Sequence, residues 1–143
     1  MKTKILAALT ATALSAPAFA ENHASGDAEA GESAYRQCKS CHMVASPDET
    51  IVKGGKTGPN LYGVAGRTAG SVEDFRYSDL IVAAGEAGLA WDEETFVGYV
   101  QDPTPWLKEY TGQDGRGKMT FKVRKEEDAV NLWAYLVSIG PGS

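Results

Sequence analysis

The sequence has very little cysteine, histidine and methionine, and this scarcity limits the chemistry available to it. Its 143 residues include 2 cysteines, 2 histidines and 3 methionines. Cys38 and Cys41 stand three positions apart with no third cysteine, so a set of disulfides joining distant segments is excluded. A zinc site would need a second pair of cysteine or histidine ligands, and only His23 is left outside residues 38–42.

Long apolar runs are also scarce. A membrane-spanning helix needs about 20 consecutive apolar residues, and no stretch of the chain reaches that length. The most apolar stretch, residues 5–16, follows two lysines and leads to a small-x-small pattern at residues 18–20. This arrangement predicts a secretory signal peptide in residues 1–20, cleaved before Glu21, which makes the mature protein periplasmic. An uncleaved membrane anchor is the alternative, and the alanine-rich end favours cleavage.

Positive charge is in deficit. The formal net charge is −5, and without the two lysines of the signal peptide it becomes −7, so a general nucleic-acid binder is excluded. The charges are unevenly spread, because residues 73–114 carry ten acidic and two basic side chains, whereas residues 115–125 carry five basic and no acidic ones. Such a dipole predicts an oriented encounter with a charged partner.

Alternating strand patterns and internal repeats are absent, so the sequence predicts an all-α domain at residues 27–143 behind a polar, mobile leader at residues 21–26. Glycine and proline recur throughout residues 43–71, which predicts a long loop. Such a long loop in a small domain suggests that a bound non-protein group fills the space it surrounds. Capping residues and apolar periodicity predict four to five short helices. Three are expected at residues 28–39, 78–87 and 103–109, and two more are expected to begin at residues 92 and 126.

The pentapeptide at residues 38–42, with letters CKSCH, allows three interpretations. A dithiol redox pair would follow a strand, but the preceding pattern is helical. Half of a zinc site would depend on His23, which is expected to be an exposed leader residue. Covalent haem attachment explains the motif best, because both thiols can add to one edge of a flat ring while His42 ligates its iron.

A second axial ligand has to be found for such an iron, and methionine, histidine or an open position are the choices. Met1 belongs to the signal peptide, and Met43 adjoins His42 and cannot reach the opposite face of the ring. Met119 is left, in a glycine-rich basic loop that is a poor place for a core methionine. We therefore predict that His42 and Met119 are the axial ligands.

Taken together, these features resemble a class I c-type cytochrome of the bacterial cytochrome c2 type. The resemblance covers nearly the whole mature chain and implies a small cytochrome c fold wrapped around one covalently bound haem c. It rests on CKSCH at residues 38–42, GPNLYG at 58–63, Arg67, Tyr77, Trp91, YVQDP at 99–103, KMTF at 118–121 and LWAYL at 132–136.

The resemblance also implies roles for individual residues. The Pro59 carbonyl would accept the ring N–H of His42, and Tyr99 would lie near the Met119 sulfur. Arg67, Tyr77 and Trp91 would hold the haem propionates. Gly31 and Tyr35 would pack against Leu132 and Tyr135. One departure is Gly117, where the family often has threonine, which predicts a weaker propionate contact and a looser methionine loop.

The function implied is that of a soluble, monomeric electron carrier rather than an enzyme. Its partners would be a quinol-oxidising bc1 complex and a reaction centre or terminal oxidase, in a respiratory or photosynthetic chain. The alternative is a haem enzyme with a labile sixth ligand, similar to a small peroxidase. A rim of basic residues is expected to guide transient docking of acidic partners, namely Lys39, Lys53, Lys56, Lys118, Lys122 and Lys125.

Overall fold

The computed structural model describes residues 23–142, and within them the fold is mostly helical, as predicted. The predicted signal peptide and its cleavage before Glu21 lie outside the described residues. All five predicted helices are present, the first continued by a short 3-10 helix. In chain order the elements are α1 (Ala28–Ala34), η1 (Tyr35–Gln37), β1 (Val44–Ala45), β2 (Thr50–Val52), α2 (Asp79–Glu86), α3 (Glu93–Gln101), α4 (Pro103–Thr111) and α5 (Glu126–Ser138).

Most helix starts follow from local sequence. The Asp27 carboxylate accepts the Ala30 N–H at 3.0 Å and caps α1. At α3, Asp92 and Thr95 form a reciprocal capping box, with the Thr95 N–H 2.8 Å from the Asp92 carboxylate. Pro103 occupies the first position of α4, where its missing N–H costs no helical hydrogen bond. Polar cap residues therefore set the boundaries that the sequence indicated.

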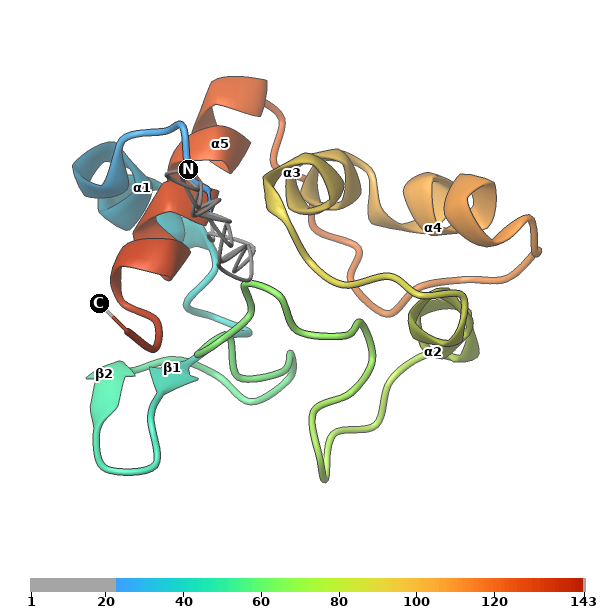
Figure 1. The fold of residues 1–143 in the computed structure, drawn as a ribbon, viewed down its shortest axis with the longest axis horizontal. Helices are drawn as coiled ribbons and strands as arrows, with labels where there is room; N and C mark the ends of the chain where they lie inside the picture. The colour runs from blue at the N-terminus through green and yellow to red at the C-terminus, as the bar shows by residue number, and fades with distance from the viewer. Residues whose placement is uncertain (1–22, 143) are drawn as a thin grey trace, which may run out of the picture.

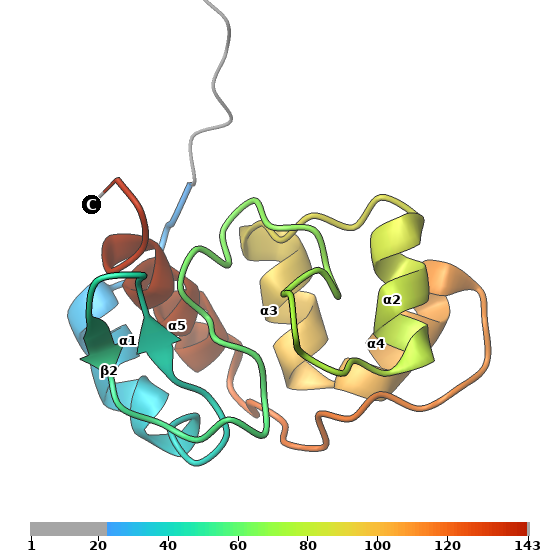
Figure 2. The same cartoon turned by 90° about the horizontal axis from the view of Figure 1, so that it is seen from below.

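The helices form two groups. In Figures 1 and 2, α1 crosses α5 on one side of the molecule, α2 and α4 lie together on the other, and α3 stands between the groups. The crossing of α1 and α5 depends on Gly31, since an added Cβ there would lie 2.7 Å from the Cβ of Tyr135. The Tyr35 and Tyr135 rings pack 5.6 Å apart beside it. The predicted contact between the first and last helices is thus confirmed.

The loop predicted at residues 43–71 is more ordered than expected. β1 and β2 form an antiparallel hairpin in which Val44 pairs with Val52 and Ala45 with Thr50. The prediction that strands are absent is therefore wrong at this point. Strands of two and three residues are too short to show an alternating pattern, and they form because Ser46 closes the turn, its hydroxyl accepting the Glu49 N–H at 3.1 Å.

The part of the predicted mobile leader that the structure describes makes contacts that the sequence did not indicate. The Trp133 indole donates to the His23 carbonyl at 2.8 Å, and the Ser25 N–H donates to the Glu93 carboxylate at 2.7 Å. Gly26 packs so closely on α5 that an added Cβ would lie 2.7 Å from the Val130 carbonyl carbon. Residues 23–26 therefore form a strap that joins α5 to the start of α3. The His23 side chain is exposed, as expected.

No helix within residues 23–142 combines the length and the hydropathy that crossing a membrane would require.

Candidate functional site

A cavity of about 360 Å³ lies at the centre of the fold, with a predominantly apolar lining. Its walls come from η1, α3, α5 and the loop segments between them. A core of short helices around so large a space is the arrangement expected of a chain that packs against a bound group. Nine residues predicted to contact the haem or its iron all line this cavity, namely Cys38, Cys41, His42, Pro59, Arg67, Tyr77, Trp91, Tyr99 and Met119.

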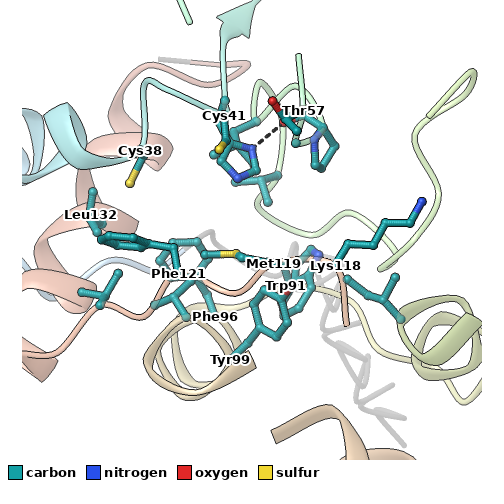
Figure 3. A pocket seen from close by; sticks show the side chains of 18 of the residues that line it. Cys38, Cys41, Thr57, Trp91, Phe96, Tyr99, Lys118, Met119, Phe121 and Leu132 are labelled. Carbon is teal, nitrogen blue, oxygen red and sulfur yellow. Dashed lines mark hydrogen bonds between the residues drawn. The ribbon is translucent and has the colours of Figure 1, made fainter. Parts of the chain in front are cut away.

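The two thiols stand at one side of the cavity, directly after η1 (Figure 3). They are free, so the pair is not a disulfide. Burial, helped by the nearby Cys41, raises the pKa of the Cys38 thiol to about 11. Redox-active dithiols have a lowered pKa, so this environment argues against the redox-pair interpretation. No group of three or more His, Cys, Asp or Glu side chains in residues 23–142 could hold a metal ion, which argues against zinc.

The His42 ring is held in one orientation. Its Nδ1 lies 2.8 Å from the Pro59 carbonyl oxygen, and because a carbonyl can only accept, Nδ1 carries the proton and Nε2 keeps a free lone pair. Burial lowers the pKa of His42, with a contribution from Arg67, so the ring is neutral at neutral pH. Gly58 lies against the ring, and an added Cβ there would be 2.7 Å from Nε2. The imidazole is therefore in the form that binds a metal.

Met119 lies across the cavity from Cys41, with Tyr99 close beside it (Figure 3). Burial raises the pKa of Tyr99 to about 12, so its hydroxyl keeps its proton and can donate a hydrogen bond. The structure thus brings Met119 to the wall that faces the thiol pair.

Three polar side chains meet the cavity where haem propionates were predicted. The Arg67 guanidinium donates through Nη1 to the carbonyls of Asn60 and Tyr62, at 3.0 and 3.3 Å, and its other N–H groups make no hydrogen bond to residues 23–142. The Tyr77 hydroxyl accepts the Val72 N–H at 3.2 Å, which leaves its own proton available to donate. Trp91 is 7% exposed, and its indole N–H has no acceptor within the described residues. The cavity wall therefore offers N–H and O–H donors that an anionic group could engage.

The predicted docking lysines are all exposed, but two of them have partners inside the molecule. The Lys118 ammonium donates to the Arg76 carbonyl, and the Lys122 ammonium lies 2.6 Å from the Asp102 carboxylate. Within residues 23–142 no ion pair involves Lys39, Lys53, Lys56 or Lys125. Lys118 and Lys122 therefore also hold the chain around Met119.

Sequence reasoning missed two residues that position His42. The Tyr35 hydroxyl donates to the His42 carbonyl at 3.1 Å, although Tyr35 had been assigned only to helix packing. Gly58 was treated as loop punctuation, whereas its missing side chain makes room for the ring. A glycine directly before the proline that holds the histidine is the signal that could have indicated this role.

Comparison with known proteins agrees with this geometry. No family model matches the chain. Cytochrome c2 of Cereibacter sphaeroides is 54% identical over 142 residues, covering 96% of this chain and 95% of that protein. The chain belongs to the cytochrome c2 family. Cytochrome c-551 of Roseobacter denitrificans is 51% identical and covers 99% of both chains. The crystal structure of cytochrome c2 from Rhodobacter sphaeroides superposes with a TM-score of 0.79 at 56% identity, covering 80% of this chain and 97% of that one.

As a cytochrome c2 homologue, the chain is an electron-transfer protein rather than an enzyme, and it carries haem c bound covalently through Cys38 and Cys41. The residues around the cavity fit this cofactor. An apolar cavity accommodates the ring, and two thiols stand together on one side of it. Donor groups of Arg67 and Tyr77 that make no hydrogen bond to residues 23–142 could bind its carboxylates.

Proposed function

We propose that the protein carries single electrons through a haem whose iron is ligated by His42 and Met119. The observation that supports this best is the His42 ring, which Pro59 holds with Nε2 free, on a cavity whose opposite wall presents Met119. With His42 and Met119 both ligating it, the iron would have no position open to a substrate. The remaining cavity residues in the proposal are Arg67, Tyr77 and Trp91 for the propionates and Tyr99 beside Met119.

When bound, the haem supplies a one-electron couple between two oxidation states of iron. The chain sets the balance between these states. Ligation by the Met119 thioether together with the His42 imidazole would raise the potential, and the apolar lining would disfavour the extra charge of the oxidised form. Tyr99, kept protonated by its burial, can donate to the Met119 sulfur and tune its strength as a ligand.

The proposed setting is the periplasm, reached through a signal peptide at residues 1–20 that is removed before Glu21. The mature protein would be a monomer with a cytochrome domain at residues 27–143. Its exposed lysines would dock a bc1 complex as donor and a reaction centre or terminal oxidase as acceptor. The charge dipole supports this docking mode, as do the four lysines that make no ion pair to residues 23–142, Lys39, Lys53, Lys56 and Lys125.

Replacing the proposed sulfur ligand tests the assignment. We expect Met119→Ala to keep its haem, because two thioether bonds hold the ring, but to show a sharply lower midpoint potential. A redox titration with reduced-minus-oxidised spectra measures both properties. Met43→Leu is the matched control and should leave the potential unchanged. An unaltered potential in Met119→Ala would show that Met119 is not a ligand.

A further inference from the structure

The chain on both sides of Met119 is attached to one short segment, residues 100–104, which we call the α3–α4 elbow. On the N-terminal side, the Gly117 N–H donates to the Thr104 hydroxyl at 3.0 Å. On the C-terminal side, the Val123 N–H donates to the Val100 carbonyl at 2.9 Å. Met119 therefore lies on a span of chain whose two ends are fixed to the same rigid turn between helices.

The tie at Gly117 is made by a side chain from outside the methionine loop. Gly117 is buried although its neighbours in the loop are exposed, so its N–H would have no water to replace a lost partner. An added Cβ at Gly117 would lie 3.2 Å from the Thr104 hydroxyl oxygen, so the contact is close. The loop that was expected to be loose because residue 117 is not threonine is thus held by a threonine hydroxyl supplied from α4.

Asp102 provides a second tie from the same elbow. It precedes α4 but makes no side-chain capping bond to that helix. Its Oδ1 is buried and receives no hydrogen bond of regular geometry, and the Lys122 ammonium lies 2.6 Å away as the compensating charge. The Lys122 and Asp102 side chains are 55% and 47% exposed, but Oδ1 itself is shielded, and the pair links the elbow to the chain three residues after Met119.

We propose that Thr104 and Asp102 are positioning residues that hold the Met119 thioether in place for the iron. This inference rests on the proposed ligation by Met119. Neither side chain lines the central cavity, so both act through the backbone of residues 117–123. Loss of either tie increases the population in which the sulfur has left the metal. The oxidised protein is affected more, because a thioether prefers reduced iron, and the midpoint potential falls.

Thr104→Val in the haem-loaded protein is the main test, because it keeps the side-chain shape and removes the hydroxyl. We expect hydrogen exchange at the Gly117 amide, followed by NMR, to speed up by roughly tenfold. The potential should fall, the sulfur-to-iron charge-transfer band of the oxidised protein should weaken, and cyanide should bind faster. Thr104→Ser, which restores the hydroxyl, should return all four readouts towards the original values.

Thr111→Val is the matched control on the same helix. The Thr111 hydroxyl also accepts a loop N–H, from Gln113 at 3.1 Å, but six residues before Met119. We expect this variant to change global stability without moving the potential or the charge-transfer band. Equal spectral effects from Thr104→Val and Thr111→Val would overturn the proposal, because general loosening of α4 would then explain both.

Asp102→Asn tests the second tie by removing the charge that Lys122 faces. The charge-transfer band should weaken as in Thr104→Val, and an unchanged band would limit the positioning role to Thr104 and overturn it for Asp102. The Met119→Ala variant separates this inference from the ligand assignment. If Met119→Ala lowers the potential but Thr104→Val does not, the elbow is not a positioning device. If Met119→Ala changes nothing, the ligand assignment itself fails.

Discussion

At the scale of single residues, the site depends on residues that hold the His42 imidazole in a fixed orientation. Pro59 and Gly58 set the orientation of the His42 ring through a carbonyl acceptor and a missing side chain. Tyr35, which is 1% exposed, donates to the backbone carbonyl of His42. The Pro59 contact fixes the tautomer and direction of the ring, and the Tyr35 contact restrains the His42 backbone. The imidazole is therefore preorganised in its metal-binding form.

Buried tyrosines make stability sensitive to alkaline pH. Burial raises the pKa of Tyr35 strongly above its ordinary value of 10.0 and that of Tyr99 to about 12. The folded protein therefore keeps these protons at pH values where the unfolded chain has lost them. The stabilisation is complete below pH 10 and declines as pH rises above it. We expect the free energy of unfolding, measured with urea and circular dichroism, to hold up to about pH 10 and to fall between pH 10 and pH 12.

Tyr35→Phe isolates this contribution, because it keeps the ring and removes the titrating hydroxyl. At pH 7 it should lose about 1 kcal/mol through the missing hydrogen bond to the His42 carbonyl. Its stability should then decline less steeply above pH 10 than that of the parent protein. A decline of the same steepness in both proteins would show that Tyr35 does not contribute to it.

At the scale of elements, the contact between α1 and α5 joins the two ends of the domain. The close approach is possible because Gly31 lacks a side chain where the backbone of Asn131 passes. Buried residues of α5, among them Leu132 and Trp133, then cover the cavity and the strap at residues 23–26. The helix pair therefore positions both the thiol-bearing turn and the part of the cavity wall that α5 supplies.

Gly31→Ala should strain this crossing severely. The new Cβ would lie 2.6 Å from the Asn131 carbonyl carbon and 2.7 Å from the Tyr135 Cβ, so the helices would have to separate. We expect a loss of about 1–3 kcal/mol in the free energy of unfolding of the haem-loaded protein. Ser33→Ala, an exposed change on the same helix, should have little effect. Equal stabilities of the two variants would refute the close-packing explanation.

At the scale of the whole molecule, charge separates into two regions along the chain. The acidic stretch at residues 73–114 includes α2, α3 and α4, whereas the basic stretch at residues 115–125 borders the cavity. Lys56 and Lys39 adjoin cavity-lining residues and have no internal ion pair within residues 23–142. They are cleaner probes of docking than Lys118 and Lys122, whose substitution would also disturb the chain around Met119.

Charge reversal at Lys56 tests oriented docking. Lys56→Glu should slow the second-order reaction with an acidic redox partner by about threefold or more near 0.01 M salt, and the difference should vanish at high ionic strength. The matched control is Lys108→Glu on α4, which changes net charge equally but lies outside the predicted rim. Its ion pair with Asp114, at 2.6 Å, joins two exposed side chains, so its loss should cost little stability. Stopped-flow kinetics over a salt series measures both. Equal slowing by the two variants would mean that net charge, not orientation, governs the encounter.

The sequence by itself determined the chemistry and most of the helices. Spacing within residues 38–42 indicated haem attachment, and elimination among three methionines left Met119 as the predicted second ligand. Asp27, Asp92 and Pro103 marked helix starts that the structure confirms. The motif and the helix starts are readable because they depend on residues within one or two turns of each other, where backbone geometry alone sets which groups can meet. Met119 could be chosen only because the chain offers so few alternatives.

The tertiary structure decided what holds those groups in place. The Thr104 hydroxyl reaches Gly117, Lys122 reaches Asp102, and the strap at residues 23–26 reaches α3 and α5, none of which the sequence indicated. The hairpin of β1 and β2 was missed for a related reason, since its pairing depends on a turn rather than on a pattern within either strand. Contacts between distant segments form only after the helices pack, so the partner of each polar group depends on the crossing of elements and not on local sequence.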